Sequence, residues 1–432
     1  MKTLCRFRMR PTRIAATALI ITVIGVFAYG TAFNMPMFTR KYDLECGSCH
    51  TVVPKLTKMG MEFRASGFRM PDDIGQPDKD INNVSTQMST RLQARYDASK
   101  TDNAGVKSDN SRFTFHEVTF YPLTGAFAKN YSSLFELSIG PEEPVEIENA
   151  YVRGDWKASS GFVSARAGVF HPFEGFGASD RPVALDRPLF QTTSANFNQK
   201  TFFTPWNFDE AGVEVGYTYD RTMVRATVFN GLTFDPNENI AHPAQTGAAG
   251  NAFAKDPSRP DFHNFDVQLF LTQILKANGG GVSLYYYKGA LALPVDNDPS
   301  TGLFWKNEFD RVAGYASYPV VDRLILMAGA QQGNDKTFTS GSGFGADSKS
   351  KGVFGEADVD LSRNWWLAGR YETFDPSDRK AKNDLNAVTV AINKPFNNGL
   401  QFISQYKRTV TKQGAVADKT TDAFQTRLIW IW

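Results

Sequence analysis

The fold is decided where the hydrophobic period of the chain becomes two, first in "TQMSTRLQARYDAS" at residues 86–99. Met88 and Leu92 alternate there with Arg91 and Arg95. Such alternation indicates a β-strand with one apolar face and one charged face. A soluble sandwich and a membrane barrel both contain strands of this kind, so the rest of the chain must distinguish them.

Segments with this strand-like alternation recur along the chain and give sixteen candidate strands. Several have the roughly 9–11 residues that a tilted strand needs to cross a bilayer. In "RFTFHEVTFY" the alternation of apolar and polar residues shifts by one position near Phe115–His116, which predicts a β-bulge. The candidates are 86–98, 111–127, 131–139, 146–156, 160–171, 211–219, 222–231, 262–275, 280–290, 307–319, 323–332, 351–361, 364–374, 385–394, 399–411 and 421–432.

The connections between these strands alternate in length. Tight connections are 128–130, 157–160, 220–221, 276–280, 320–323, 362–364 and 395–398. The intervening connections are long, at 99–110, 172–210, 232–261, 291–306, 333–350, 375–384 and 412–420, with 140–145 as the short exception. Short turns at one end and long loops at the other are typical of an outer-membrane barrel, and two packed soluble sheets have no reason to sort their loops in this way.

The chain ends in "AFQTRLIWIW" at 423–432, which places Phe424, Leu428, Trp430 and Trp432 on one face. This ending suits the lipid face and aromatic girdle of a barrel. The sequence therefore predicts a mainly-β fold in which residues 86–432 form an antiparallel outer-membrane β-barrel of about sixteen strands.

Residues 1–32 have the features of a secretory signal. Basic residues such as Lys2 and Arg6 precede an apolar run from Ile14 to Ala28, and cleavage is expected after Ala32. A retained anchor helix is the alternative. The formal net charge of +2 gives no strong bias toward nucleic acid. Export by a Sec-type signal to the bacterial outer membrane is the expected route.

The mature chain keeps two cysteines, both in "LECGSCH" at 44–50. In C-x-x-C-H the thiols of Cys46 and Cys49 would attach one haem c covalently, and His50 would be the proximal ligand of its iron. A thioredoxin-like pair lacks a βαβ context here, and a zinc half-site lacks a second Cys/His pair nearby. Residues 33–85 are thus expected to form a monohaem cytochrome segment.

The distal haem ligand is less well specified by the residues. A helix is expected at about 54–66, ending at Gly67, and Met70 follows it beside a proline. Met70 is the first candidate, while Met59 and Met61 suit core packing, and His116 or an open site are alternatives. A segment of about 50 residues is too small to cover a haem alone. We therefore expect it to plug the barrel lumen.

Residues 35–70, "MPMFTRKYDLECGSCHTVVPKLTKMGMEFRASGFRM", resemble the fused monohaem cytochrome–porin family, typified by an outer-membrane iron oxidase. The barrel resembles this family only in its strand number, length and ending. The resemblance implies that Cys46 and Cys49 form the thioethers and that His50 is the proximal ligand. It also implies an electron conduit from extracellular Fe(II) to a periplasmic cytochrome c or another electron carrier.

Other functions remain open at this stage. The conduit could run outward to external acceptors, or the protein could be a solute porin with a structural haem plug, and a soluble periplasmic peroxidase is a remote fourth reading. The acidic stretch "GPEEPVEIEN" at 140–149 either attracts Fe(II) or is a solvated loop, and its acidic residues are Glu142, Glu143, Glu146 and Glu148. The residues specify the lipid of the outer membrane as a partner and leave the oligomeric state open.

Overall fold

The computed structural model describes residues 36–77, 83–141, 145–171, 186–193, 210–230, 232–235, 240–243, 266–294, 304–337, 347–362, 365–378, 382–396, 399–414 and 416–432. The predicted signal segment 1–32 and its cleavage site lie outside these residues. Within the described residues, no helix combines the length and apolarity needed to span a membrane.

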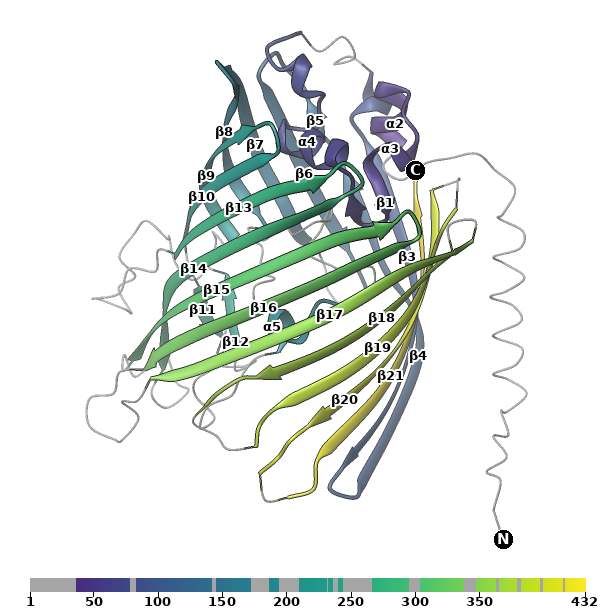
Figure 1. Ribbon diagram of the computed structural model, residues 1–432, viewed down its shortest axis with the longest axis vertical. Helices are drawn as coiled ribbons and strands as arrows, with labels where there is room; N and C mark the ends of the chain where they lie inside the picture. Colours follow the sequence, from purple (N-terminus) through teal and green to yellow (C-terminus); the bar gives the residue numbers. More distant parts are fainter. Residues whose placement is uncertain are drawn as a thin grey trace.

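Sixteen antiparallel strands of the described chain close into a barrel, so the predicted fold is confirmed (Figure 1). The first strand and the last strand pair with each other, and β4 continues past a break as the short β5 (Gly125–Ala126). The strands are β3 (Ser89–Asn103), β4 (Val106–Tyr121), β6 (Tyr131–Ile139), β7 (Glu146–Ala158), β8 (Gly161–Phe170), β9 (Glu210–Tyr219), β10 (Thr222–Phe229), β13 (Asp266–Lys276), β14 (Gly280–Pro294), β15 (Phe304–Val321), β16 (Leu324–Thr337), β17 (Ser348–Ser362), β18 (Trp365–Asp375), β19 (Leu385–Pro395), β20 (Leu400–Thr411) and β21 (Lys419–Ile431).

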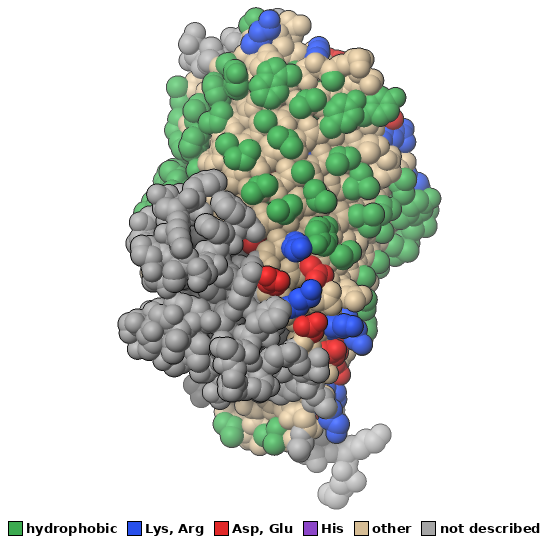
Figure 2. Space-filling view, turned by 90° about the vertical axis from the view of Figure 1, so that its left-hand side faces the viewer, with side chains coloured by type: hydrophobic (Ala, Val, Ile, Leu, Met, Phe, Trp, Pro, Cys, Tyr) green, Lys and Arg blue, Asp and Glu red, His purple; other side chains and the backbone are tan. Residues whose placement is uncertain are grey.

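The barrel wall is apolar outside and largely polar inside. Along β13, Val267 and Leu269 are exposed, whereas Asp266 and Gln268 are buried. Figure 2 shows hydrophobic side chains spread over the outer wall, with charged side chains mostly toward the lower, long-loop end. This arrangement is the reverse of a soluble protein and matches a barrel whose surroundings are hydrocarbon.

The end with the tight turns carries exposed aromatic side chains. Tyr131 and Trp156 pack edge-to-face there, with ring centroids 6.2 Å apart. Trp430 and Trp432 lie 4.7 Å apart at the end of β21, and both are exposed as predicted. The backbone of Trp432 exchanges hydrogen bonds with Thr90 and so helps to close the seam. Aromatic rings at this level mark the interface between lipid and water.

The structure confirms the predicted bulge and corrects one connection. Gln93 pairs with Glu117 and Ala94 pairs with Phe115, so His116 is the extra residue on β4. The connection 99–110 was expected to be a long loop, but β3 and β4 continue to a two-residue turn at Ala104–Gly105. Strands that extend beyond the lipid are wet on both faces, so the alternation of apolar and polar residues stops before the strand does.

The N-terminal segment, residues 36–77 and here called the plug, lies at the tight-turn end of the barrel (Figure 1). It contains α2 (Pro36–Tyr42), α3 (Cys46–Cys49), β1 (His50–Val52), β2 (Lys55–Leu56), α4 (Lys58–Ala65) and η1 (Pro71–Asp73), and η2 (Val84–Thr86) leads into β3. Three further elements belong to connections between strands, namely α5 (Leu189–Thr192), β11 (Leu232–Asp235) and β12 (Ile240–Pro243).

Candidate functional site

The C-x-x-C-H residues form a compact turn in which α3 is followed directly by β1. Thr57 holds this turn to the next helix, because its backbone N–H donates to Cys49 O (2.9 Å) and its hydroxyl donates to Ser48 O (2.7 Å). The same hydroxyl accepts from Gly60 N (3.1 Å) as the N-cap of α4. One threonine therefore fixes both the cysteine turn and the start of the helix beneath it.

Helix α4 approaches the turn so closely that only glycine fits at the contact. A methyl group on Gly60 would overlap the carbonyl oxygen of Cys49 and would come within 2.9 Å of Leu56 Cδ2. The helix ends at Ala65 with Ser66 as its C-cap, and the predicted stop residue Gly67 follows with a φ of +73°, a conformation that glycine adopts without strain. The helix begins later than predicted, since residues 50–56 form the β1–β2 hairpin instead.

Gly60→Ala is expected to lower the stability of the plug by about 1–3 kcal/mol, because the backbone of the cysteine turn would have to move. Gly47→Ala is the matched control, since a methyl group on Gly47 meets nothing within 4 Å. Chemical denaturation, followed by a signal that reports on the plug, measures the difference in the free energy of unfolding. Equal stability of the two variants would contradict the close contact between α3 and α4.

The surroundings of His50 favour a neutral imidazole. Burial lowers the pKa of His50 to about 4, against the opposing effect of the Pro54 and Lys55 backbone groups. Proline has no N–H, so Pro54 can act on the ring only through its carbonyl. Nδ1 of His50 is buried and makes no hydrogen bond of good geometry. A neutral ring beside backbone carbonyls is the form in which histidine serves as a metal ligand.

The donor set fits a covalent haem. Cys46 and Cys49 are half-buried and are not bonded to each other. Burial, and then the neighbouring Cys46, raise the pKa of the Cys49 thiol. Two accessible thiols on a single turn, followed at once by a neutral imidazole, are the groups that haem c attachment requires. Cys46, Cys49 and His50 would hold the group, and it would supply one-electron transfer.

The β1–β2 hairpin enters the lumen and contacts its polar wall. Val53 O accepts hydrogen bonds from Asn393 Nδ2 (2.9 Å) and Gln401 Nε2 (3.3 Å). At the rim, Arg69 donates to the carbonyl groups of Lys129 (2.8 Å) and Tyr131 (2.7 Å). Both sets of contacts lie near the tight-turn end of the barrel and join the plug to its wall.

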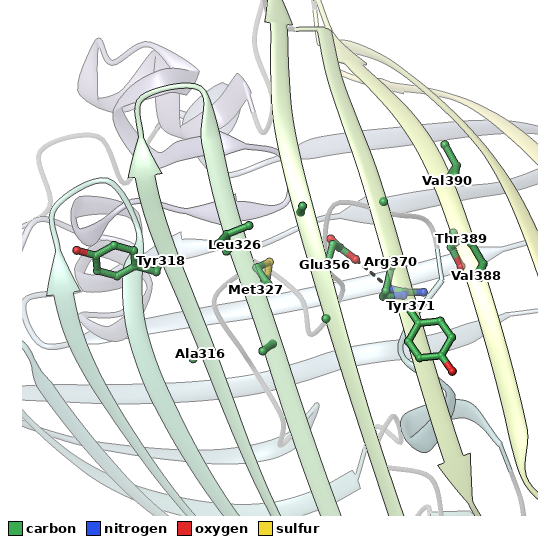
Figure 3. A pocket seen from close by; sticks show the side chains of 14 residues that line it. Ala316, Tyr318, Leu326, Met327, Glu356, Arg370, Tyr371, Val388, Thr389 and Val390 are labelled. Atoms are coloured by element: carbon green, nitrogen blue, oxygen red, sulfur yellow. Dashed lines mark hydrogen bonds and ion pairs between the residues drawn. The ribbon is translucent and has the colours of Figure 1, made fainter.

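Lys55 is almost fully buried, with 2% of its surface exposed. Its neighbours on β17 are Glu356 and Asp358, which attract its charge, whereas burial lowers the pKa of Lys55 to about 8. Glu356 also forms an ion pair with Arg370 (3.3 Å), drawn in Figure 3. Behind this pair, exposed Tyr371, Val388 and other outward residues form a shallow lipid-facing groove of about 710 Å³.

An apolar cluster lies on one side of the lumen, among buried polar side chains of the same strands such as Arg311 and Glu372. Val52 and Leu56 of the plug share a cluster with aromatic wall residues and with Phe190 of α5, which lies inside the barrel. Helix α5 is anchored there by Leu189 N, which donates to Glu372 Oε2 (2.6 Å), and by Gln191 Nε2, which donates to Tyr315 Oη (3.0 Å). The sequence did not predict this apolar lining, since the alternation indicated strands with one apolar face and one charged face.

The opposite wall, around β3, β4, β6 and β7, is charged. Arg91 pairs there with Glu117 (2.8 Å), Glu136 (3.5 Å) and Glu148 (3.8 Å). Of the four acidic residues singled out for Fe(II), Glu148 therefore lies in this inner network, and Glu146 begins β7. Glu142 and Glu143 lie outside the described residues. The structure does not gather the four into one site within its described part.

The candidate distal ligands lie in different places. Met61 is buried in the apolar cluster of the lumen, and Met59 is half-buried on the same helix. Met70 packs against a second cluster, which contains Phe63 and Phe68. His116 lies on β4, where its Nδ1 is 3.2 Å from Arg95 Nη1. The assignment of Met70 stays a prediction.

Comparison with known proteins supports the barrel fold. No protein-family model and no curated protein sequence matches the chain. An anion-selective porin from Comamonas acidovorans is similar in structure, with a TM-score of 0.51 and 12% sequence identity over 79% of this chain and 98% of that one. The outer membrane channel DcaP of Acinetobacter baumannii (TM-score 0.49, 12% identity, 80% and 96% covered) and OprB of Pseudomonas putida (0.48, 10%, 82% and 98%) also match. The fold is that of outer-membrane porins.

Proposed function

We propose that the chain is an outer-membrane electron conduit of the fused monohaem cytochrome–porin type. The observation that carries the proposal is the docking of a C-x-x-C-H turn, with its thiols accessible and its imidazole neutral, in the mouth of a closed porin-fold barrel. Cys46 and Cys49 attach the haem and His50 is its proximal ligand. Met70 remains the first candidate for the distal position.

The barrel lies in the bacterial outer membrane with its tight turns in the periplasm. The apolar outer wall, the aromatic rim and the porin fold support this location, and short turns face the periplasm in such barrels. The plug then faces the periplasm as well. Its half-buried cysteines lie where a soluble cytochrome c or another carrier can approach.

Extracellular Fe(II) is the proposed electron donor, each ion giving up one electron. Its proposed path to the plug follows the wall that carries Arg91 and its carboxylate partners, on the side away from the apolar cluster and α5. Carboxylates such as Glu117 and Glu136 provide the hard oxygen groups that such a cation tolerates. The same path serves an outward conduit, and the potential of the haem decides the direction.

Anaerobic stopped-flow absorbance tests this proposal. The oxidised, haem-loaded protein is mixed with Fe(II) near neutral pH, and we expect rapid growth of the reduced α-band. His50→Ala at matched haem content is expected to lose this reaction, because the iron loses its proximal ligand. If dithionite reduces the haem but Fe(II) does not, the donor is another compound and the outward conduit becomes the better account.

A solute porin with a structural haem plug is the second candidate, and the structural comparison favours it because the similar proteins are porins and channels. Planar-bilayer recording separates the two functions. A porin gives steady ion conductance, and Fe(II) that passes through it reduces a cytochrome c enclosed in vesicles equally well in the His50→Ala variant. The conduit reduces the enclosed cytochrome c even where its ion conductance is small, and His50→Ala abolishes that reaction.

A further inference from the structure

A narrow cavity of about 50 Å³ separates α4 of the plug from the barrel wall at β7–β10 and β13. Arg64, Arg153, Arg166 and Arg225 line it, and none of its described lining residues is Asp or Glu. The four arginines come from α4, β7, β8 and β10, so only the docked plug brings them together. A cavity lined in this way is built for an anion.

The guanidinium groups are held in position on the wall side. Arg166 stacks on Phe170 at 3.9 Å from the ring centroid, and Arg225 stacks on Phe270 at 4.4 Å. Arg153 and Arg166 are 6% and 3% exposed. Stacking uses the face of a guanidinium and leaves its N–H edge for hydrogen bonds. Nε and Nη2 of Arg166 both face Glu214 at 2.9 Å, so Arg166 acts on the cavity chiefly through its charge.

Two carboxylates support these arginines without lining the cavity. Glu214 pairs with Arg166 (2.9 Å) and Arg225 (3.8 Å), and Asp155 pairs with Arg153 (2.8 Å). Arg153 also donates to Ala65 O of the plug. These contacts orient the basic groups, and the acidic partners lie outside the set that faces the cavity.

The cavity lies beside the cysteine turn. Leu56, which lines it, is the register partner of His50, and Arg64 is close enough for its charge to act on the imidazole. Its volume admits groups of the size of a few water molecules and excludes a porphyrin ring. A haem held at the cysteines carries two propionate carboxylates on the edge of its ring.

We propose that this cavity is a carboxylate site that receives the haem propionates, with Arg64 and Arg153 nearest the plug and Arg166 and Arg225 adding positive charge from the wall. The inference rests on the proposed function, because a haem at Cys46 and Cys49 supplies the carboxylates. The basic groups stabilise the reduced haem, which has one positive charge fewer than the oxidised form, and so raise its midpoint potential.

Spectroelectrochemical titration of Arg166→Gln and Arg64→Gln tests the site. In each variant the equilibrium constant for reduction of the haem is expected to fall about tenfold. This corresponds to a fall of about 59 mV in midpoint potential for one electron. Arg64→Gln leaves the buried Arg166–Glu214 pair intact and so guards against misfolding. Arg95→Gln on β3 is the control, since it removes an inward positive charge that does not line the cavity.

The outcomes separate this inference from the proposed function. Full haem content with no shift beyond the Arg95→Gln control overturns the propionate site and leaves the electron conduit standing. Purified protein without haem overturns the proposed function itself. The ratio of anion to cation permeability can also be measured in a potassium chloride gradient. If Arg166→Gln changes this ratio without shifting the midpoint potential, the cavity binds free anions and the proposal is overturned.

Discussion

Replacing Cys46 and Cys49 together by serine is expected to remove the haem completely. Both thioethers depend on these sulfur atoms, and the described residues contain no other cysteine. The haem absorbance of the purified protein should fall to background, and the reaction with Fe(II) should disappear with it. The barrel should still fold, because its sixteen strands close without the plug cysteines.

Cys5→Ser is the matched control for this experiment. Cys5 precedes the apolar run of the predicted signal segment and should be absent from the mature protein. Haem content should therefore stay at one per chain. Covalently bound haem in the double serine variant would show that the attachment site is elsewhere and would contradict the assignment of the motif.

Lys55→Met is expected to destabilise the docked plug by about 3 kcal/mol. The substitution preserves much of the side-chain volume but leaves Asp358 and Glu356 in the lumen without the positive charge of the plug. Removing one partner from a buried set of charges typically costs about 3–5 kcal/mol. Guanidinium denaturation followed by haem absorbance should show the plug unfolding earlier, while circular dichroism should show an unchanged barrel.

Two further variants give this prediction its controls. Lys58→Met removes a partly exposed ion pair with Glu62 and should cost no more than about 0.5 kcal/mol. Combining Lys55→Met with Asp358→Asn should recover part of the loss, because both members of the buried set then become uncharged. An additive effect of the two substitutions would mean that Lys55 and Asp358 do not interact.

The barrel was predictable because lipid imposes a period of two on every strand within it. Leu361 and Val353 are exposed and Glu356 and Asp358 are buried, in agreement with the alternation read from the chain. The alternation was uninformative outside the lipid, where Lys100 and Thr101 extend β3 with polar residues on both faces. The turn at Ala104–Gly105 was missed for that reason.

The interior of the barrel was much less predictable. Inward Tyr287 packs on Phe309, and Phe354 packs on Phe190 of α5, which comes from a distant part of the chain, so no local pattern predicts these contacts. The arginine cavity has the same origin, since its groups come from α4 and three separate strands. The cysteine turn was read from five adjacent residues, whereas its support by Thr57 and Gly60 appeared only in three dimensions.

Intact-mass spectrometry of the protein purified from outer membranes tests the central claim most directly. The account predicts a chain that begins after Ala32 and carries the added mass of one haem, with both Cys46 and Cys49 resistant to alkylation. A mature chain of unmodified mass, with both thiols reactive, would contradict it and would leave a porin-fold channel without an electron carrier.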